Sequence, residues 1–330
     1  MSGTLTKKEK RGSVSITDVA NLADVSVATV SRVMNANGAV DPALKRKVNI
    51  TSRKLGFSPK RVTPCLAIIT GRQSPALPVG YVSVLTAMLS RLAAHRGVVA
   101  ELIDIDNLDI CLEPHISGAI GIVFDDRLLE LTQVPNLPLV AINKPLADKG
   151  VHSFYSDHYH QSLEATNYLI QHGHQDIAFL AIEPDEWGSR ERRRGYEDAM
   201  ASANLQVTPN RIQYSVEQPL YETLARWKAR GVTAILNFSE DAGLETLHIL
   251  GNVLGLRLGQ DISTISLEDL PIYQYMSPPQ TVVWQPLETL AQLAIDRLLQ
   301  VMSHDDGQIS DICLETRLIE RDSVARIPQT

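Results

Sequence analysis

Residues 16–35 read ITDVANLADVSVATVSRVMN, and two short helical patterns follow each other within this stretch. Apolar side chains recur at helical spacing from Ile16 to Ala23, and Asp24 then breaks the pattern. Ser26 suits the N-cap of a second helix, whose apolar side chains run from Val27 to Met34. Two helices of about eight residues joined by a tight turn predict a helix-turn-helix, whose second helix can enter the major groove of DNA. By periodicity alone, any helical hairpin is an equal alternative.

The charge of the chain is divided unevenly along its length. Twelve of the 31 Lys and Arg residues, but only four of the 38 Asp and Glu residues, lie in residues 1–62. This segment therefore carries a net charge of +8 and the remainder −15, although the whole chain carries only −7. A basic segment on an acidic body is typical of a protein that binds DNA phosphates through one end. The charge pattern favours DNA binding over a merely solvated basic face.

A third helix is predicted from Pro42 to about Leu55. Asp41 is placed to cap it, Pro42 suits the first helical position, and Gly56 follows its end. The side chains expected to point inward are Leu44, Val48, Ile50 or Thr51, and Leu55. These helices make a small helical headpiece over residues 15–59, preceded by a flexible basic arm at 1–14 and followed by a short linker at 60–65.

From Leu66 onward, apolar strand patterns alternate with amphipathic helices. The strands are expected at 66–70, 98–103, 119–124, 139–143, 176–182, 233–238 and 262–267. The helices are expected at 82–95, 161–172, 190–203, 242–254 and 287–303. This alternation predicts an α/β core of two doubly wound parallel sheets. Ligands in such folds bind at the carboxyl ends of strands, so we expect a cleft between two lobes.

Several classes of protein are disfavoured. No apolar run approaches the ~18 to 20 residues of a membrane span, and the opening MSGTLTKKEKRGS lacks the apolar core of an export signal. Cys65, Cys111 and Cys313 are isolated, which fits a reducing cytoplasm rather than disulfides or zinc. The sequence shows no phosphate loop, nucleophile motif or paired carboxylates. We therefore expect no enzyme, catalytic residue or cofactor.

Four histidines cluster in the sequence, but not at the spacing of a metal site. His158 and His160 open a predicted helix, and His172 and His174 close it. At 1.5 Å per residue the two pairs lie roughly 18 Å apart. We therefore expect no shared metal site.

The run from Ile16 to Pro59 resembles the headpiece of the LacI/GalR family of bacterial transcriptional repressors. The resemblance lies in VSVATVSRVMN, VDPALKRKV and LGFSP. Val27-Ala28 stands where the family's base-reading pair falls, and looks like the pair of galactose-repressor-type members. Both side chains are short and apolar, so they can contact thymine methyls but cannot bond guanine or adenine bidentately. The expected DNA-binding residues are Thr17, Ser26, Val27, Ala28, Thr29, Ser31, Arg32 and Asn35.

The chain departs from the family after Pro59. Family members continue with a hinge helix of the pattern Asn-x-x-Ala-Arg-x-Leu, which inserts a leucine into the minor groove. Here Pro59 is followed by KRVTPC, and the first strand of the core starts at Leu66. Pro64 and the β-branched residues before it disfavour a helix. We expect this shortened hinge to stay non-helical on DNA.

The body resembles the family's periplasmic-binding-protein-like core along nearly its full length. The resemblance lies in HGHQDIAFL, SRERRRGYEDAM, VTAILNFSEDAGLETL, LGQDISTISLEDL, PPQTVVWQPLETLAQLAIDRLL and LIERDSVAR. It implies one lobe from 66–155 and 285–312 and another from 156–284 and 313–330. It also implies an effector site of Arg192, Asn143, Ser239, Glu268, Tyr81 and Trp187, able to bond a polyol or an anion. Ser239-Glu240 replaces an Asn-Asp pair of the family, and Glu268 replaces an Asp.

The resulting prediction is a cytoplasmic, sequence-specific transcriptional regulator, a repressor of carbohydrate-use genes controlled by a small molecule in the cleft. As a homodimer it would bind double-stranded DNA at a pseudo-palindromic operator. One alternative is a regulator whose core senses no small molecule or is controlled by a protein partner, which the short hinge and Ser239-Glu240 keep open. A solute-binding protein shares the core fold, but the basic headpiece and the missing export signal disfavour it.

Overall fold

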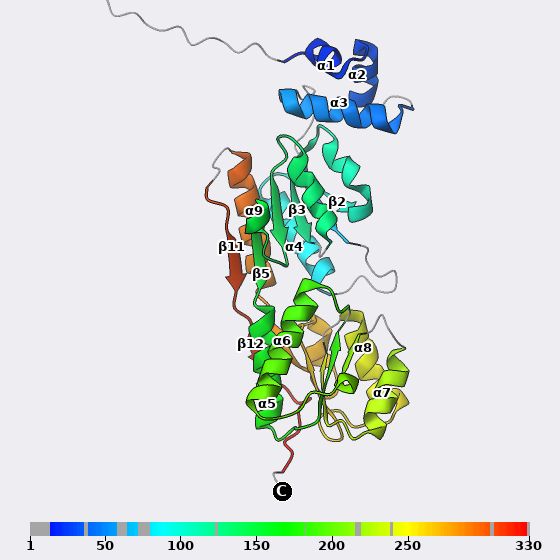
Figure 1. The fold of residues 1–330 in the computed structure, drawn as a ribbon, viewed down its shortest axis with the longest axis vertical. Helices are drawn as coiled ribbons and strands as arrows, with labels where there is room; N and C mark the ends of the chain where they lie inside the picture. The colour runs from blue at the N-terminus through cyan, green and yellow to red at the C-terminus, as the bar shows by residue number, and fades with distance from the viewer. Residues whose placement is uncertain are drawn as a thin grey trace, which may run out of the picture.

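The computed structural model describes residues 14–35, 39–57, 65–71, 80–122, 125–181, 183–214, 219–237, 240–303 and 307–328. A small helical headpiece lies at one end of an elongated molecule, followed by two α/β lobes (Figure 1). Most of the predicted hinge and of the basic arm falls outside the described residues.

The headpiece has the three predicted helices, α1 (Ile16–Ala23), α2 (Val27–Met34) and α3 (Pro42–Leu55). A capping box between Ser15 and Asp18 begins α1, and Asp24 ends it in the left-handed conformation at φ 52°. Ser26 caps α2, and Gly56 ends α3 at φ 69°. The small apolar core consists of Val19, Ala20, Ala23, Val30, Val33 and Val48.

The expected inward face of α3 is partly wrong. Val48 and Thr51 are buried, but Leu44, Ile50 and Leu55 are only half-buried. Asn49, Ser52 and Arg53 are buried instead. The reason is that α3 lies between the other two helices and the first lobe, so a second face of it is covered (Figure 1).

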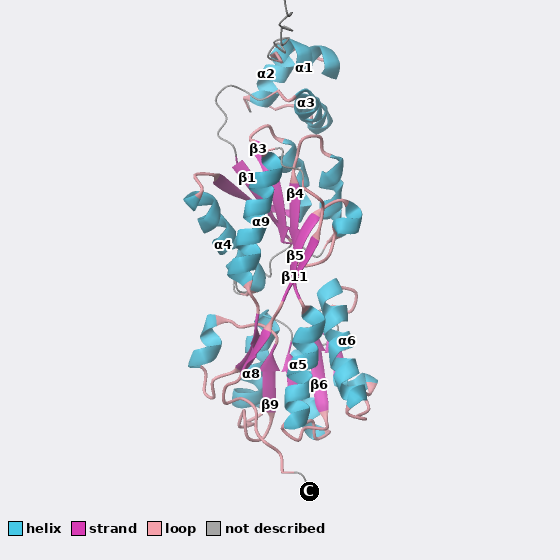
Figure 2. Ribbon diagram, turned by 90° about the vertical axis from the view of Figure 1, so that its left-hand side faces the viewer, coloured by secondary structure: helices cyan, strands magenta, loops and turns pink. Residues whose placement is uncertain are grey.

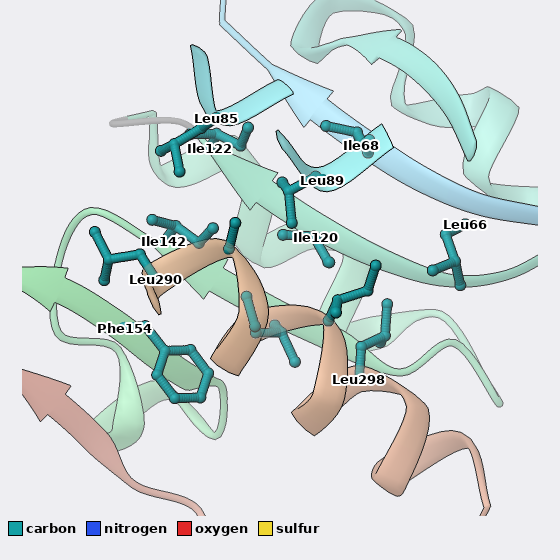
Figure 3. Packing of buried hydrophobic residues seen from close by; sticks show 14 of the residues in the cluster. Leu66, Ile68, Leu85, Leu89, Ile120, Ile122, Ile142, Phe154, Leu290 and Leu298 are labelled. Carbon is teal, nitrogen blue, oxygen red and sulfur yellow. The ribbon is translucent and has the colours of Figure 1, made fainter. Parts of the chain in front are cut away.

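The first lobe is built on a parallel sheet with the strand order β11-β5-β4-β3-β1-β2. Its strands are β1 (Cys65–Thr70), β2 (Val99–Asp104), β3 (Ile116–Ile122), β4 (Leu139–Ile142), β5 (His152–Ser156) and β11 (Asp311–Leu314). Helices α4 (Tyr81–His95) and α9 (Leu287–Met302) cover one face. Figure 3 shows Leu85 and Leu89 of α4 and Leu290 and Leu298 of α9 packed against the strand side chains.

The other face of this sheet carries short 3-10 helices in place of α-helices. These are η1 (Ile105–Leu112) and η2 (Asp126–Gln133), and Cys111, Leu128 and Leu131 pack from them against the sheet. Since β2, β3 and β4 are part of one parallel sheet, each of these connections runs from the carboxyl edge back to the amino edge. We did not predict either helix.

The second lobe repeats the plan with the strand order β12-β10-β9-β8-β6-β7, in which only β12 among the described strands is antiparallel to its neighbour. The strands are β6 (Ile177–Ala181), β7 (Ile212–Tyr214), β8 (Ala234–Asn237), β9 (Ser263–Ser266), β10 (Thr281–Trp284) and β12 (Arg317–Ile319). The helices are α5 (His158–Gln171), α6 (Trp187–Ser202), α7 (Leu220–Ala229) and α8 (Glu240–His248), the last continuing as a π-helical segment, η5 (Ile249–Val253). Short 3-10 turns complete the chain at Ala147–Lys149, Pro209–Arg211 and Pro271–Tyr275.

The predicted fold class is confirmed: a helical headpiece precedes two doubly wound sheets. Helices α5 and α6 begin three residues earlier in the structure than predicted, at His158 and Trp187. The weakly patterned elements β5, β7, β10, β11, β12 and α7 were not predicted. Residues 313 and 314, which we expected in the second lobe, belong to β11 and pair with β5 of the first.

The chain passes between the lobes after β5, after β10 and after β11. Because these three strands end at the crossings, the carboxyl ends of both sheets face the junction between the lobes (Figure 2). Among the described residues, no helix combines the length and the apolar character needed to cross a bilayer.

Candidate functional site

The outer end of the headpiece presents the residues expected to bind DNA. Ser26 caps α2 by accepting a hydrogen bond from the Thr29 amide at 3.1 Å, and the two hydroxyls lie 2.8 Å apart. Val27 is 43% exposed, whereas Val30, one turn further along, is fully buried. The side chains that open α2 therefore project into solvent rather than pack. The helix N-terminus beside them is a favourable site for a phosphate.

The remaining candidates lie on α1 and along α2. Thr17, Ala28, Arg32 and Asn35 are exposed, and Ser31 is half-buried. Asn35 donates to the backbone carbonyl of Ser31 at 2.9 Å and to its hydroxyl at 3.2 Å, so these two side chains are held together. All eight residues lie on α1, α2 and their caps, the part of the headpiece farthest from the lobes (Figure 1).

The basic charge of the headpiece is not all available to DNA. Lys45 pairs with Glu113 at 2.6 Å, Arg46 pairs with Asp109, and Arg53 is buried against the first lobe. These three cations come from α3 and contact the first lobe, away from the helices that are predicted to contact DNA. Arg32, Lys47 and Lys54 remain exposed. The net charge of +8 read from the sequence therefore overstates the charge that faces phosphates.

Buried polar side chains lie at the carboxyl ends of the strands, at the junction of the lobes. Asn143 follows β4 with φ 112°, and neither atom of its fully buried side-chain amide has a hydrogen-bond partner. Asn237 ends β8 of the other lobe, is 2% exposed, and has the same two atoms without a partner. An unbonded buried amide costs roughly 1 to 3 kcal/mol per group, so these two amides are candidates for contact with a ligand. Asn237 was missed, although it closes the apolar run AIL.

Arg192 is buried, as a cleft residue should be, at 2% exposure. Its Nε donates to the Gln161 side-chain oxygen at 2.7 Å. The Gln161 amide in turn donates to the backbone carbonyl of Leu267 at 2.5 Å. Gln161 thus connects Arg192 with the residue before Glu268. Gln161 could not be predicted as a site residue, because no neighbour in the sequence distinguishes it from the other polar residues of the expected helix.

Trp187 joins an aromatic cluster beside Arg192. Its ring lies 5.4 Å from that of His158 and 5.3 Å from that of Tyr155. Burial lowers the pKa of His158 well below its usual range, and the charge of Arg192 lowers it further, against a smaller rise from the Gln161 hydrogen bond. His158 is therefore neutral at pH 7. From the sequence, His158 is distinguished only as one of four clustered histidines.

Tyr81 and Glu268 line a separate cavity of about 260 Å³, together with Trp284 and Gln285. Trp187 and Arg192 do not line this cavity. Gln161 nevertheless connects Arg192 to Leu267, the residue before Glu268. Asn143 lies at the carboxyl edge of the first sheet, directly after β4. Ser239 falls outside the described residues. Within the described ranges, no group of three or more His, Cys, Asp and Glu side chains is placed to hold a metal.

Comparisons with known proteins identify the headpiece and the core. Residues 15–60 match the family model "Bacterial regulatory proteins, lacI family". Residues 101–217 match "Periplasmic binding proteins and sugar binding domain of LacI family", and 166–324 match a periplasmic binding protein-like domain. The chain belongs to the lacI family of bacterial regulatory proteins.

Relatives in this family align over almost the whole chain. The probable transcriptional repressor ExuR of Bacillus subtilis is 26% identical over 95% of this chain and 99% of its own length. The transcriptional regulator CelR of Thermobifida fusca is 26% identical over 96% and 99%. A solved complex of a CelR regulator with cellobiose superposes with a TM-score of 0.68 at 25% identity, covering 94% of this chain and 99% of that one. The lac repressor dimer bound to operator shares the fold, with a TM-score of 0.68 at 22% identity. The chain is thus a DNA-binding transcriptional regulator, as its headpiece predicted.

Proposed function

We propose that this regulator represses carbohydrate-use genes and responds to a sugar or sugar derivative bound between its lobes. The observation that carries the proposal is the pair of buried, unbonded amides of Asn143 and Asn237, one from each sheet. A polyol offers donors and acceptors that satisfy such groups. The cellobiose bound to the related CelR regulator supports the same ligand class. Acting on genes places the protein in the cytoplasm with the DNA.

We further propose that the protein acts as a homodimer, with one headpiece on each half of a pseudo-palindromic operator. The related lac repressor is described as a dimer on its operator. Large apolar side chains are exposed on both lobes, including Val99 and Leu102 on the edge strand β2 and Tyr275, which is 78% exposed. Side chains such as these are available for contact with a second copy of the chain.

The ligand proposal is tested by titrating the full chain with cellobiose, galactose and glucuronate in a calorimeter. Two neighbouring arginines on α6 provide a matched pair of variants. Arg192 is buried in the cleft, whereas the Arg194 side chain is 57% exposed and pairs with Glu191. Losing a charged hydrogen bond costs about 1.5 to 3 kcal/mol, so Arg192→Gln should weaken sugar binding by at least tenfold. Arg194→Gln should leave it within about twofold.

Operator binding without sugar should be unchanged in both variants. If none of the three sugars binds the parent protein, the carbohydrate class is wrong. A core that is controlled by a protein partner would then become the better interpretation.

A further inference from the structure

Arg53 of α3 makes the central contact between the headpiece and the first lobe. It is only 8% exposed, although it belongs to the headpiece and its partners belong to the lobe. Its Nη2 donates to the backbone carbonyls of Cys111, Glu113 and Ile116 at 2.8, 2.9 and 2.5 Å. Its Nε donates to the carbonyl of Leu112 at 3.1 Å. One guanidinium therefore bonds the end of η1 and the start of β3.

The chemistry of these acceptors suits a cation. Cys111, Leu112 and Glu113 form the end of η1, where backbone carbonyls lack partners within the helix and carry partial negative charge. Burial lowers the pKa of Arg53, but an arginine keeps its charge at any pH at which the protein is folded. A guanidinium satisfies several carbonyls at once because its donors diverge in one plane. A lysine could not reproduce this contact.

The lobe also reaches back to the headpiece. The side-chain amide of Asn136 donates to the backbone carbonyl of Arg53 at 2.6 Å, and Arg53 donates to the Asn136 carbonyl at 3.4 Å. Asn136 lies between η2 and β4 in the left-handed conformation, at φ 53°. The two ion pairs of Lys45 and Arg46 lie outside this bonded centre and are more exposed. The contact thus has a buried polar centre and a charged rim.

We propose that Arg53 locks the headpiece onto the amino edge of the first sheet, so that the headpiece and the first lobe move as one body. In a dimer, this lock fixes the distance and the angle between the two recognition helices. The sequence from Pro59 onward lacks the hinge pattern of the family, so this contact takes over the positioning of the headpiece. Arg53 is accordingly a positioning residue for half-site spacing, and contacts no DNA.

The first test measures the distance between the headpiece and the lobe by pulsed electron spin resonance. Spin labels are placed at Leu22→Cys and Lys149→Cys, both exposed, in a chain with Cys313→Ser. Labelled chains are diluted with unlabelled protein so that only distances within one chain are seen. The parent should give one narrow distance peak, and Arg53→Gln should lose it.

Two further variants separate the lock from general damage to the headpiece. Asn136→Gly removes the lobe's bond to Arg53, tolerates the positive φ, and leaves the headpiece sequence intact; it should also broaden the peak. Arg46→Ala removes an exposed ion pair and should leave the peak narrow. A broad peak in the parent, or a narrow peak in both Arg53→Gln and Asn136→Gly, overturns the proposal.

The second test concerns spacing and rests on the proposed homodimer, whereas the first does not. Duplexes selected from random sequence by the parent protein are remade with one base pair added or removed at the centre. The parent should lose at least tenfold in affinity for the altered duplexes, and Arg53→Gln should discriminate less than threefold. Equal discrimination by both proteins would show that Arg53 does not set the spacing, even if the distance measurement confirms the lock.

Discussion

Two valines one turn apart on α2 have opposite environments. Val27 is largely in solvent beside the exposed N-terminus of the helix, while Val30 is enclosed by the headpiece core. An apolar side chain that is exposed at the start of the second helix of a helix-turn-helix is suited to contact thymine methyl groups. The position of Val27, rather than its chemistry, distinguishes it from Val30.

We predict that Val27→Ala changes the sequence preferred by the protein more than its overall affinity. Each base-pair preference of this kind is worth about 1 to 3 kcal/mol. Selection from random duplexes, followed by sequencing, measures the change. Val30→Ala is the matched control and should lower the melting temperature without altering the selected sequence. An unchanged preference in Val27→Ala would mean that Val27 only packs.

His158 gives the core a dependence on pH. Because its pKa is lowered in the folded protein, the unfolded chain takes up a proton near pH 6.5 while the folded chain does not. The free energy of unfolding should therefore fall as the pH drops below about 6.5, and this group should have no effect above it. Urea unfolding at pH 7.5, 6.5 and 5.5 measures this. His158→Gln should reduce the fall, whereas His95→Gln, at an exposed position on α4, should not.

At the scale of elements, the contact between α5 and α6 depends on one glycine. A Cβ built on Gly195 would lie 2.2 Å from the carbonyl oxygen of Tyr159, so the two helices approach too closely for any side chain. The RRRGY motif of α6 thus combines a ligand candidate, Arg192, with the glycine that lets its helix lie against α5 and Gln161.

Gly195→Ala should destabilise the protein although alanine favours a helix by about 1 kcal/mol over glycine. The clash with a backbone oxygen can only be relieved by separating the helices, at a cost of roughly 1 to 3 kcal/mol. Thermal unfolding measures the effect. Gly251→Ala provides the control, because a Cβ there meets nothing within 4 Å. Equal melting temperatures for the two variants would contradict the close approach.

Elements with regular apolar spacing could be predicted from the sequence. Elements that are too short to show a spacing, or whose contacts are hydrogen bonds to backbone, could not. Caps and turns at Ser26, Asp41 and Gly56 could be predicted because they depend on local chemistry. The buried face of α3 could not, because Arg53 bonds backbone carbonyls, and every residue type has one. The 3-10 helices η1 and η2 carry too few turns to show a periodicity.

At the scale of the molecule, charge is arranged along the long axis. The helices predicted to contact DNA, α1 and α2, carry exposed Arg32, whereas several cations of α3 face the first lobe. The chain as a whole is acidic, with a net charge of −7. DNA should therefore be attracted to one end and repelled by the lobes.

We predict that operator affinity falls steeply with salt, since each phosphate neutralised adds about 0.9 to the slope of log K against log salt. Arg32→Ala should reduce this slope by about 0.9 if it contacts a phosphate. Arg46→Ala should leave it unchanged, because Arg46 already pairs with Asp109. Fluorescence anisotropy at several salt concentrations measures all three proteins. A flat response of the parent would contradict the prediction.

The residues of the candidate cleft could be predicted from the sequence only through their positions in the family pattern. Arg192, Asn143 and Glu268 are all buried, and their contact with an effector stays a prediction. Gln161 and His158 were missed because their contacts, with Arg192 and Trp187, involve residues distant in the sequence. Asn237 was missed because only the folded chain shows that its buried amide has no hydrogen-bond partner.

The connections through η1 and η2 begin at the cleft and end beside the headpiece. A tilt of the first lobe at the cleft is therefore transmitted to the headpiece as a larger displacement. A six-residue strand spans about 20 Å and two layers of helix add about 20 Å, so the recognition helix lies roughly 40 Å from the cleft. At that distance from the cleft, a tilt of the lobe by about 5° displaces the helix by about 3.5 Å, close to the rise of one base pair. A sugar that closes the lobes by so small an angle would move each headpiece by one base pair along the DNA.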